Sequence, residues 1–204
     1  MKTIICAASI LLLVLPARSQ EPPAPQPRAQ EDDYKVYSLV LQSNYIREGV
    51  ERLVIGDRTP MAFPPVMMGM TQPGETPEMK KIRKTATKET TRDYEEKNKS
   101  SALLENRFSV NVPIVLMSEE DRDRIFQVKG EGEKKTGNPK GFDEFYRLYP
   151  KSTGFISLSR IGYNPAKMQA LVYIGNLCGT GRVFLVVKED GVWKVEYVAM
   201  TWIS

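Results

Sequence analysis

The chain has 204 residues, with 29 basic side chains, 25 acidic side chains and no histidine. This length suits one domain with its own core. The net charge of +4 gives no indication of a nucleic-acid partner, because such proteins usually carry a clustered basic excess. The lack of histidine excludes Ser-His-Asp and Cys-His catalytic sites and the usual zinc sites, since each needs an imidazole.

The first residues have the pattern of an export signal. Lys2 precedes an apolar run over residues 4–15, and a small-x-small pattern ends at Ser19. The run is shorter than the roughly 20 residues that a membrane-spanning helix needs. We expect a signal peptide over residues 1–19, cleaved near Ser19, and an exported protein, periplasmic or extracellular, whose mature chain has no transmembrane segment. An uncleaved anchor is the alternative.

Residues 20–32 contain four prolines among polar residues, which favours an extended linker. We expect residues 33–204 to form a single α+β domain. After signal cleavage Cys178 is the only cysteine, so an internal disulfide is excluded. The sequence predicts a free thiol at Cys178, with a disulfide between two chains as the alternative.

The first expected helix covers residues 33–47. Its aromatic stripe includes Tyr34, Tyr37 and Tyr45 at helical spacing, which is more typical of core packing than of a ligand cavity. A strand is expected over residues 51–58.

An irregular stretch over residues 59–78 holds four clustered methionines, Met61, Met67, Met68 and Met70. Thioethers bind copper(I), but the spacing is irregular and no histidine is available to help. A loop over the edge of the core is the favoured interpretation.

Residues 80–99 alternate charges and predict one solvated helix, in which Asp93 and Lys97 form an i,i+4 pair. A polyanion-binding patch is the alternative. A strand follows at residues 106–117. Helices are then expected from Ser118, as N-cap, to residue 126 and over residues 141–149.

The last fifty residues predict a four-strand antiparallel meander over residues 154–162, 169–175, 182–188 and 192–204. Short turns rich in Gly, Asn and Pro separate these strands, and such connections are too short for parallel crossovers. The alternation around Trp193 places its ring in the core. We therefore expect a twisted antiparallel sheet with helices packed on one face.

Several segments resemble an uncharacterised family of exported bacterial proteins. The matching runs are 145–150, 153–164, 169–173, 193–195 and 202–204. The match also includes the first expected helix with residues 53–55, and residues 104–108. The resemblance implies the fold and the compartment but no known activity. In that family the turn between the second and third meander strands carries two cysteines, of which only Cys178 has a counterpart here. This departure argues against a disulfide or redox role for the turn.

No constellation of residues completes a catalytic site. Asp143 and Glu144 are adjacent, so on a helix they point about 100° apart. For Cys178 as a nucleophile, Arg182 is the only nearby cation to activate it. Arg160 lies on an expected strand, where a structural salt bridge is favoured over an anion site.

These observations favour a non-catalytic binding or interaction module with an unknown protein or small-molecule partner. A carboxylate-dependent hydrolase is the alternative. No phosphate-binding loop is present, and we expect no cofactor, no metal and no nucleic-acid partner. The candidate residues for ligand contact or interaction are Arg160, Tyr163, Tyr37 and Cys178.

Overall fold

The computed structural model describes residues 27–60, 75–126, 141–177 and 180–203. The helices are α1 (Glu31–Asn44), α2 (Pro77–Thr85), α3 (Lys88–Lys97), α4 (Glu119–Phe126) and α5 (Gly141–Leu148). The strands are β1 (Arg52–Gly56), β2 (Ile114–Met117), β3 (Ser152–Leu158), β4 (Gly162–Tyr163), β5 (Gln169–Asn176), β6 (Thr180–Glu189) and β7 (Val192–Ile203). The predicted α+β class is confirmed.

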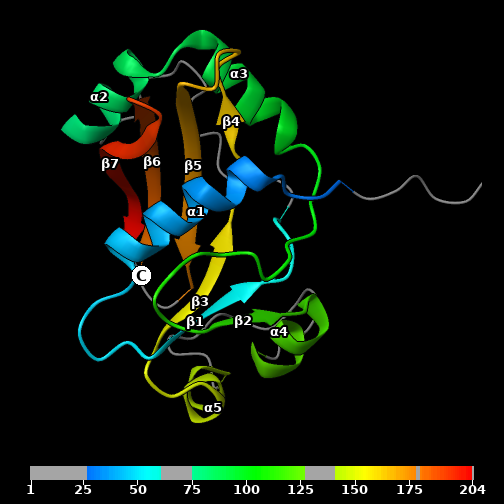
Figure 1. Cartoon of the computed structure of the whole chain (residues 1–204). Coiled ribbons are helices and arrows are strands. Elements are labelled where there is room, and N and C mark those ends of the chain that lie inside the picture. Colours follow the sequence, from blue (N-terminus) through cyan, green and yellow to red (C-terminus); the bar gives the residue numbers. More distant parts are fainter. Residues whose placement is uncertain (1–26, 61–74, 127–140, 178–179, 204) are drawn as a thin grey trace, which may run out of the picture.

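All seven strands belong to one mostly antiparallel sheet, in the order β2-β1-β3-β5-β6-β7, with β4 paired to β5 (Figure 1). The predicted meander is confirmed, because β3, β5, β6 and β7 pair in sequence and antiparallel. Its first strand, predicted over residues 154–162, ends at Leu158, and β4 is a separate short strand. In contrast, β1 pairs in parallel with both β2 and β3. The sequence did not predict these parallel pairings, which join strands that are far apart along the chain.

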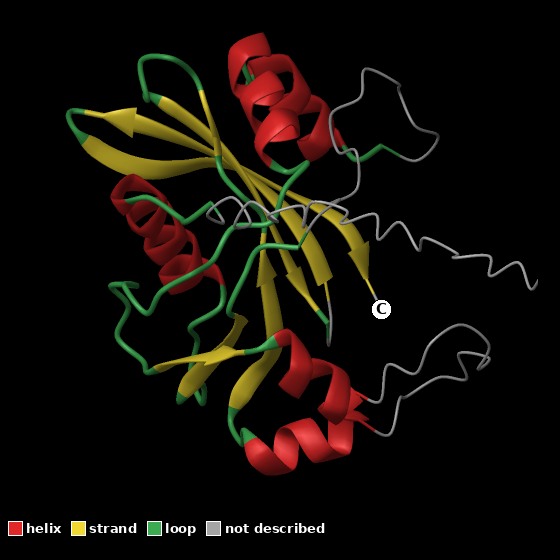
Figure 2. Cartoon of the chain, turned by 90° about the vertical axis from the view of Figure 1, so that its right-hand side faces the viewer, coloured by secondary structure: helices red, strands yellow, loops and turns green. Residues whose placement is uncertain are grey.

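Helices cover both faces of the sheet, which corrects the expectation that they pack on one face (Figure 2). On one face, α1 packs against alternate residues of the central strand, such as Val172 and Ile174. On the other face, Ile82 of α2 and Tyr94 of α3 pack against Leu171 and its neighbours. Because successive strand residues point to opposite faces, β5 is buried on both sides.

The single helix predicted over residues 80–99 is two helices, separated at Ala86 and Thr87. The side chain of Gln169 bridges the break: its Oε1 accepts from the Thr87 amide at 2.7 Å and its Nε2 donates to the Thr85 carbonyl at 3.1 Å. Thr87 also caps α3 by accepting from the Thr90 amide. A contact from a distant strand therefore stabilises a break that local charge patterning concealed.

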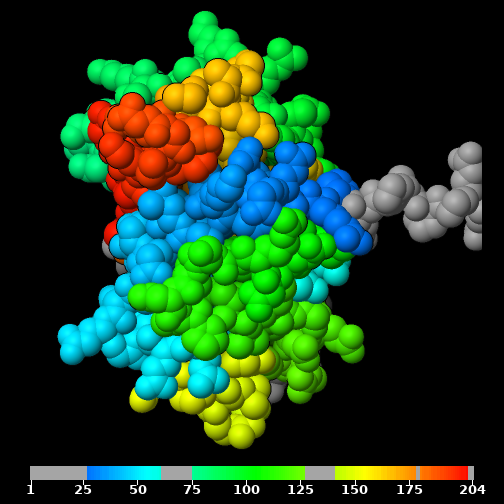
Figure 3. All heavy atoms as spheres, viewed as in Figure 1, coloured from blue at the N-terminus to red at the C-terminus, as the bar shows by residue number. Residues whose placement is uncertain are grey.

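The strand predicted over residues 106–117 is limited to β2, at its last four residues. The preceding stretch lies along α1, as the green surface below the blue helix shows (Figure 3). Polar side chains of α1 accept hydrogen bonds from the backbone of this stretch. Ser38 accepts from the amide of Ser109, and Gln42 accepts from the amide of Asn111. These bonds replace a strand ladder, so the segment stays irregular.

The remaining boundaries lie close to prediction. Helix α1 begins at Glu31, and Pro27 and Ala29, within the expected linker, pair with Leu103. Ser118 accepts from the Asp121 amide at the start of α4, as predicted. The methionine cluster of residues 61–70 lies outside the described residues. Within the described part of the chain, no helix is long and apolar enough to cross a membrane.

Candidate binding groove

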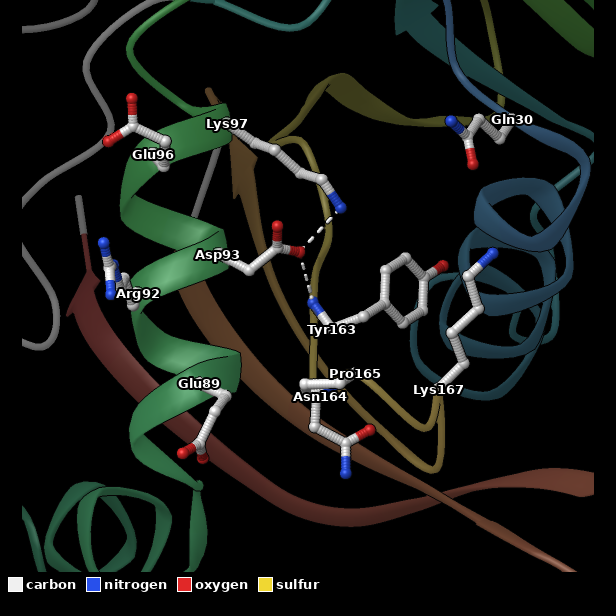
Figure 4. A pocket seen from close by; sticks show the side chains of 10 residues that line it. All are labelled: Gln30, Glu89, Arg92, Asp93, Glu96, Lys97, Tyr163, Asn164, Pro165 and Lys167. Carbon is white, nitrogen blue, oxygen red and sulfur yellow. Dashed lines mark hydrogen bonds and ion pairs between the residues drawn. The ribbon is translucent and has the colours of Figure 1, made fainter.

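An open cavity of about 430 Å³ lies between α3 and the turn that connects β4 to β5 (Figure 4). We call it the α3–β4 groove. Its walls carry charged side chains of both signs: Glu89, Arg92, Asp93, Glu96, Lys97 and Lys167. Tyr163, Asn164, Pro165 and Gln30 complete the lining. One of the four predicted candidates, Tyr163, therefore lines the groove.

Tyr163 connects both helices that flank the groove. Its backbone amide donates to Asp93 Oδ2 on α3 at 2.7 Å, and its hydroxyl donates to Asp33 Oδ1 on α1 at 3.0 Å. Its ring packs against Trp193, with the ring centroids 6.0 Å apart. Burial, and after it the charge of Asp33, raises the pKa of Tyr163 well above the ordinary value. The hydroxyl therefore stays protonated and remains a donor.

Two lysine amines lie close to the Tyr163 ring. Lys97 Nζ is 5.0 Å from the ring centroid, 2.6 Å from Asp93 Oδ2 and 3.2 Å from the Ile161 carbonyl oxygen. Lys167 Nζ is 5.8 Å from the same centroid. Both distances are within the range of cation–π attraction, so the ring and the carboxylates fix the positions of the amines.

Lys167 also connects the groove to the start of α1. Its Nζ is 3.2 Å from Asp32 Oδ2, and Lys35 contacts the other oxygen of that carboxylate. Hydrogen bonds from Lys167 and then from Lys35 lower the pKa of Asp32. Asp32 is therefore unsuited to act as a general acid near neutral pH.

A close backbone approach and side-chain hydrogen bonds fix the β4–β5 turn beside α3. Gly162 lies against the backbone of α3: an added Cβ would be 2.4 Å from the Tyr94 nitrogen. In the turn, Asn164 Oδ1 accepts from the amides of Met168 and Gln169 at 2.8 and 3.0 Å. This Asx-type bonding fixes the turn that presents Lys167.

Arg160 does not form the predicted salt bridge with any described carboxylate. Its Nη1 instead donates to the Lys97 carbonyl oxygen at 3.1 Å and to Ser100 Oγ at 2.8 Å. Its backbone amide donates to Asn98 Oδ1 at 2.8 Å. The guanidinium thus hydrogen-bonds a carbonyl oxygen in the last turn of α3, where the helix dipole favours a cation.

Tyr37 is buried in the core, as expected for the aromatic stripe, and its hydroxyl donates to the Ser159 carbonyl at 2.7 Å. It borders a second cavity of about 20 Å³, together with Asp33, Lys97 and Arg160. This volume suits one water molecule. Arg160, Tyr37 and Tyr163 therefore converge on adjoining cavities, whereas Cys178 lies outside the described residues.

The carboxylates do not form an opposed pair in the groove. The three that line it, Glu89, Asp93 and Glu96, all belong to α3. Figure 4 shows Glu89 and Glu96 directed away from Asp93, which already bonds Lys97 and Tyr163. Glu144, considered from the sequence, pairs with Arg147 on the exposed surface of α5. Among the described residues, no group of three His, Cys, Asp or Glu side chains could hold a metal ion.

Sequence reasoning found part of this site. It identified Tyr163 and the Asp93–Lys97 pair, whose bond is confirmed at 2.6 Å. It missed Asp33 and Lys167 as neighbours of Tyr163, because their approach depends on tertiary packing. A scan of protein-family models, a search of curated proteins and a search of solved structures found no match to the chain. The groove must therefore be interpreted from its own chemistry.

Proposed function

We propose that the protein is an exported, non-catalytic binding module and that the α3–β4 groove is its ligand site. The observation that carries this proposal is the fixed charge arrangement around Tyr163. Asp93 and Lys97 are bonded to each other, and Lys167 is held by Asp32. A site whose side chains are already held in place loses less conformational entropy when a ligand binds.

The groove suits a polar ligand that carries both signs of charge, such as a short peptide segment or a zwitterionic small molecule. Its volume of about 430 Å³ is within the range of small-ligand pockets. Glu89 and Arg92 are exposed and have no ion-pair partner among the described residues. They remain free to pair with opposite charges on a ligand.

A thermal-shift screen with zwitterionic tripeptides tests the proposal. A tripeptide that stabilises the wild-type protein should lose most of this effect in Arg92→Gln and Lys167→Gln. Lys194→Gln is the matched control, because Lys194 is an exposed, ion-paired lysine on β7. Equal stabilisation of all three variants would exclude the groove as the binding site.

The alternative function, a carboxylate-dependent hydrolase, is less well supported by the geometry. Glycosidases of the usual type place two carboxyl groups on opposite sides of the scissile bond. Here Asp93 is the only groove carboxylate bonded to the Tyr163 backbone, and the same oxygen also contacts Lys97. Turnover of chromogenic glycosides or esters by the wild type, and its loss in Asp93→Asn, would favour the hydrolase.

Export is supported by the N-terminal pattern of Lys2, the apolar run and Ser19, and by the resemblance to exported bacterial proteins. We expect the mature chain to begin at Gln20. Intact-mass measurement of the protein recovered from a bacterial expression host, after separating periplasm from cytoplasm, tests this. A full-length mass in the cytoplasmic fraction alone would contradict export.

A further inference from the structure

The outer face of α2 carries a cluster of lysines. Lys80, Lys81 and Lys84 on α2 and Lys88 at the start of α3 are all exposed. We call these four residues the α2 lysine face. None of them forms an ion pair within the described part of the chain, in contrast to the six other lysines that do.

Basic side chains outnumber acidic ones along this segment. Residues 75–88 include five basic and two acidic side chains, and one of the acids, Glu75, bonds Arg83 at 3.0 Å. The adjoining residues 61–74 contain no charged side chain. Lys84 lies three positions after Lys81 and four positions after Lys80. Like charges at these spacings destabilise an isolated helix. Of these three lysines, only Lys84 lies in the last turn of α2, where the helix dipole favours a cation.

The shape of this surface indicates what it can contact. The apolar side of α2, centred on Ile82, is buried against β6 and β7, so the lysines point away from the sheet. In Figure 1, α2 lies at an outer corner of the molecule, above the sheet. At this outer corner the exposed lysines can approach an extended charged plane.

The residue types on this face further limit the chemical class of the partner. Lysine amines are flexible point charges, whereas the one arginine of α2, Arg83, is already engaged by Glu75. The only aromatic residue of α2 or α3, Tyr94, is buried, so no ring is available for stacking on nucleic-acid bases. Clusters of four or more Lys or Arg residues on an amphipathic helix are typical of proteins that bind anionic lipid surfaces. Helix α2 carries four such residues, Lys80, Lys81, Arg83 and Lys84, and Lys88 follows at the start of α3.

We propose that the α2 lysine face docks the protein on an anionic phospholipid bilayer. The contact is peripheral, because the apolar side of α2 is committed to the core and cannot insert between the lipids. Binding is therefore electrostatic and falls with salt, since charges at a membrane surface act over about a Debye length. This inference is independent of the ligand site in the α3–β4 groove.

Vesicle co-sedimentation of the full chain tests the proposal. The probes are phosphatidylcholine vesicles with and without about 30 mol% phosphatidylglycerol, at low and at high salt. The test variant replaces Lys80, Lys81, Lys84 and Lys88 with Gln. The control variant makes the same replacement at four exposed, ion-paired lysines elsewhere: Lys35, Lys99, Lys151 and Lys194. Both variants lose equal charge and keep the same N-terminal residues.

We expect the α2 variant to lose at least about tenfold in partitioning to anionic vesicles, and the control variant to change by less than about twofold. Equal losses in the two variants would overturn the proposal, because net charge alone would then account for binding. Equal binding of the wild type to neutral and to anionic vesicles would overturn the proposal as well. Stronger binding of duplex DNA than of anionic vesicles at the same salt would assign the face to a nucleic acid instead.

Discussion

The hydroxyl of Tyr163 donates a hydrogen bond to Asp33 across 130 positions of sequence, at 3.0 Å. This bond connects β4 to α1, while the backbone amide of Tyr163 connects β4 to Asp93 of α3. The two helices belong to opposite faces of the sheet. A single residue at the end of the sheet thus holds together both layers and the wall of the groove.

Tyr163→Phe should lower the free energy of unfolding by about 1.5–3 kcal/mol, the usual contribution of a hydrogen bond to a charged group. Chemical denaturation measures this change. A double-mutant cycle with Asp33→Asn separates the pairwise contribution from the loss of the Asp33 bond to the Gln30 amide. A coupling energy below about 0.5 kcal/mol would show that the two side chains act independently.

Gly162→Ala should be strongly destabilising, by about 3 kcal/mol or more, because the new methyl group would overlap the backbone of α3. Gly175→Ala on β5 is the matched control. Its added Cβ would meet Tyr173 at 3.4 Å and Ser157 at 4.0 Å, both ordinary contacts, so a change within about 1 kcal/mol is expected. Urea denaturation compares the two variants; similar midpoints would mean that α3 can move away from β4 at little cost.

The sequence predicted those elements that depend on the spacing of neighbouring residues. The meander follows from alternation and turn residues, and Trp193 is 8% exposed, as its alternation indicated. The tyrosine spacing of α1 likewise predicted its buried face. These features depend on neighbouring residues, so the sequence contains the information directly.

Pairings between distant segments were not predictable in this way. The parallel pairing of β1 with β2 and β3 has no local signature. The break between α2 and α3 is stabilised by Gln169, more than 80 positions away, in addition to the local N-cap of Thr87. Arg160 was expected to meet a carboxylate, but the end of α3 supplies neutral oxygens instead. The candidate site is likewise assembled from α1, α3 and the β4–β5 turn, which only the tertiary fold brings together.

Trp193→Ala should cost about 3–5 kcal/mol, the usual range for truncating a buried tryptophan. Trp193→Phe should cost less, because it keeps most of the packing and removes an indole N–H that is buried without a described partner. Val192→Ala, at a side chain 61% exposed on the same strand, should stay within about 0.5 kcal/mol. A melting temperature for Trp193→Ala equal to that of Val192→Ala would contradict the observed burial.

The protein should lose stability as the pH rises above about 10. Burial raises the pKa values of Tyr37, Tyr45, Tyr94 and Tyr163, so the folded protein retains protons that the unfolded chain releases above the ordinary tyrosine pKa of about 10. The stabilisation is fully present below that pH and is lost progressively above it, by up to about 1.4 kcal/mol per pH unit for each tyrosine.

Denaturant unfolding between pH 8 and pH 11 measures this dependence, with tyrosine ionisation followed by ultraviolet absorbance. Tyr163→Phe provides the internal comparison, since it removes one of these buried phenols. Its free energy of unfolding should fall less steeply with pH than that of the wild type. The difference in slope should be up to about 1.4 kcal/mol per pH unit, the contribution of one tyrosine. Identical slopes would mean that Tyr163 ionises as readily in the folded protein as in the unfolded chain, contrary to its burial and its bond to Asp33.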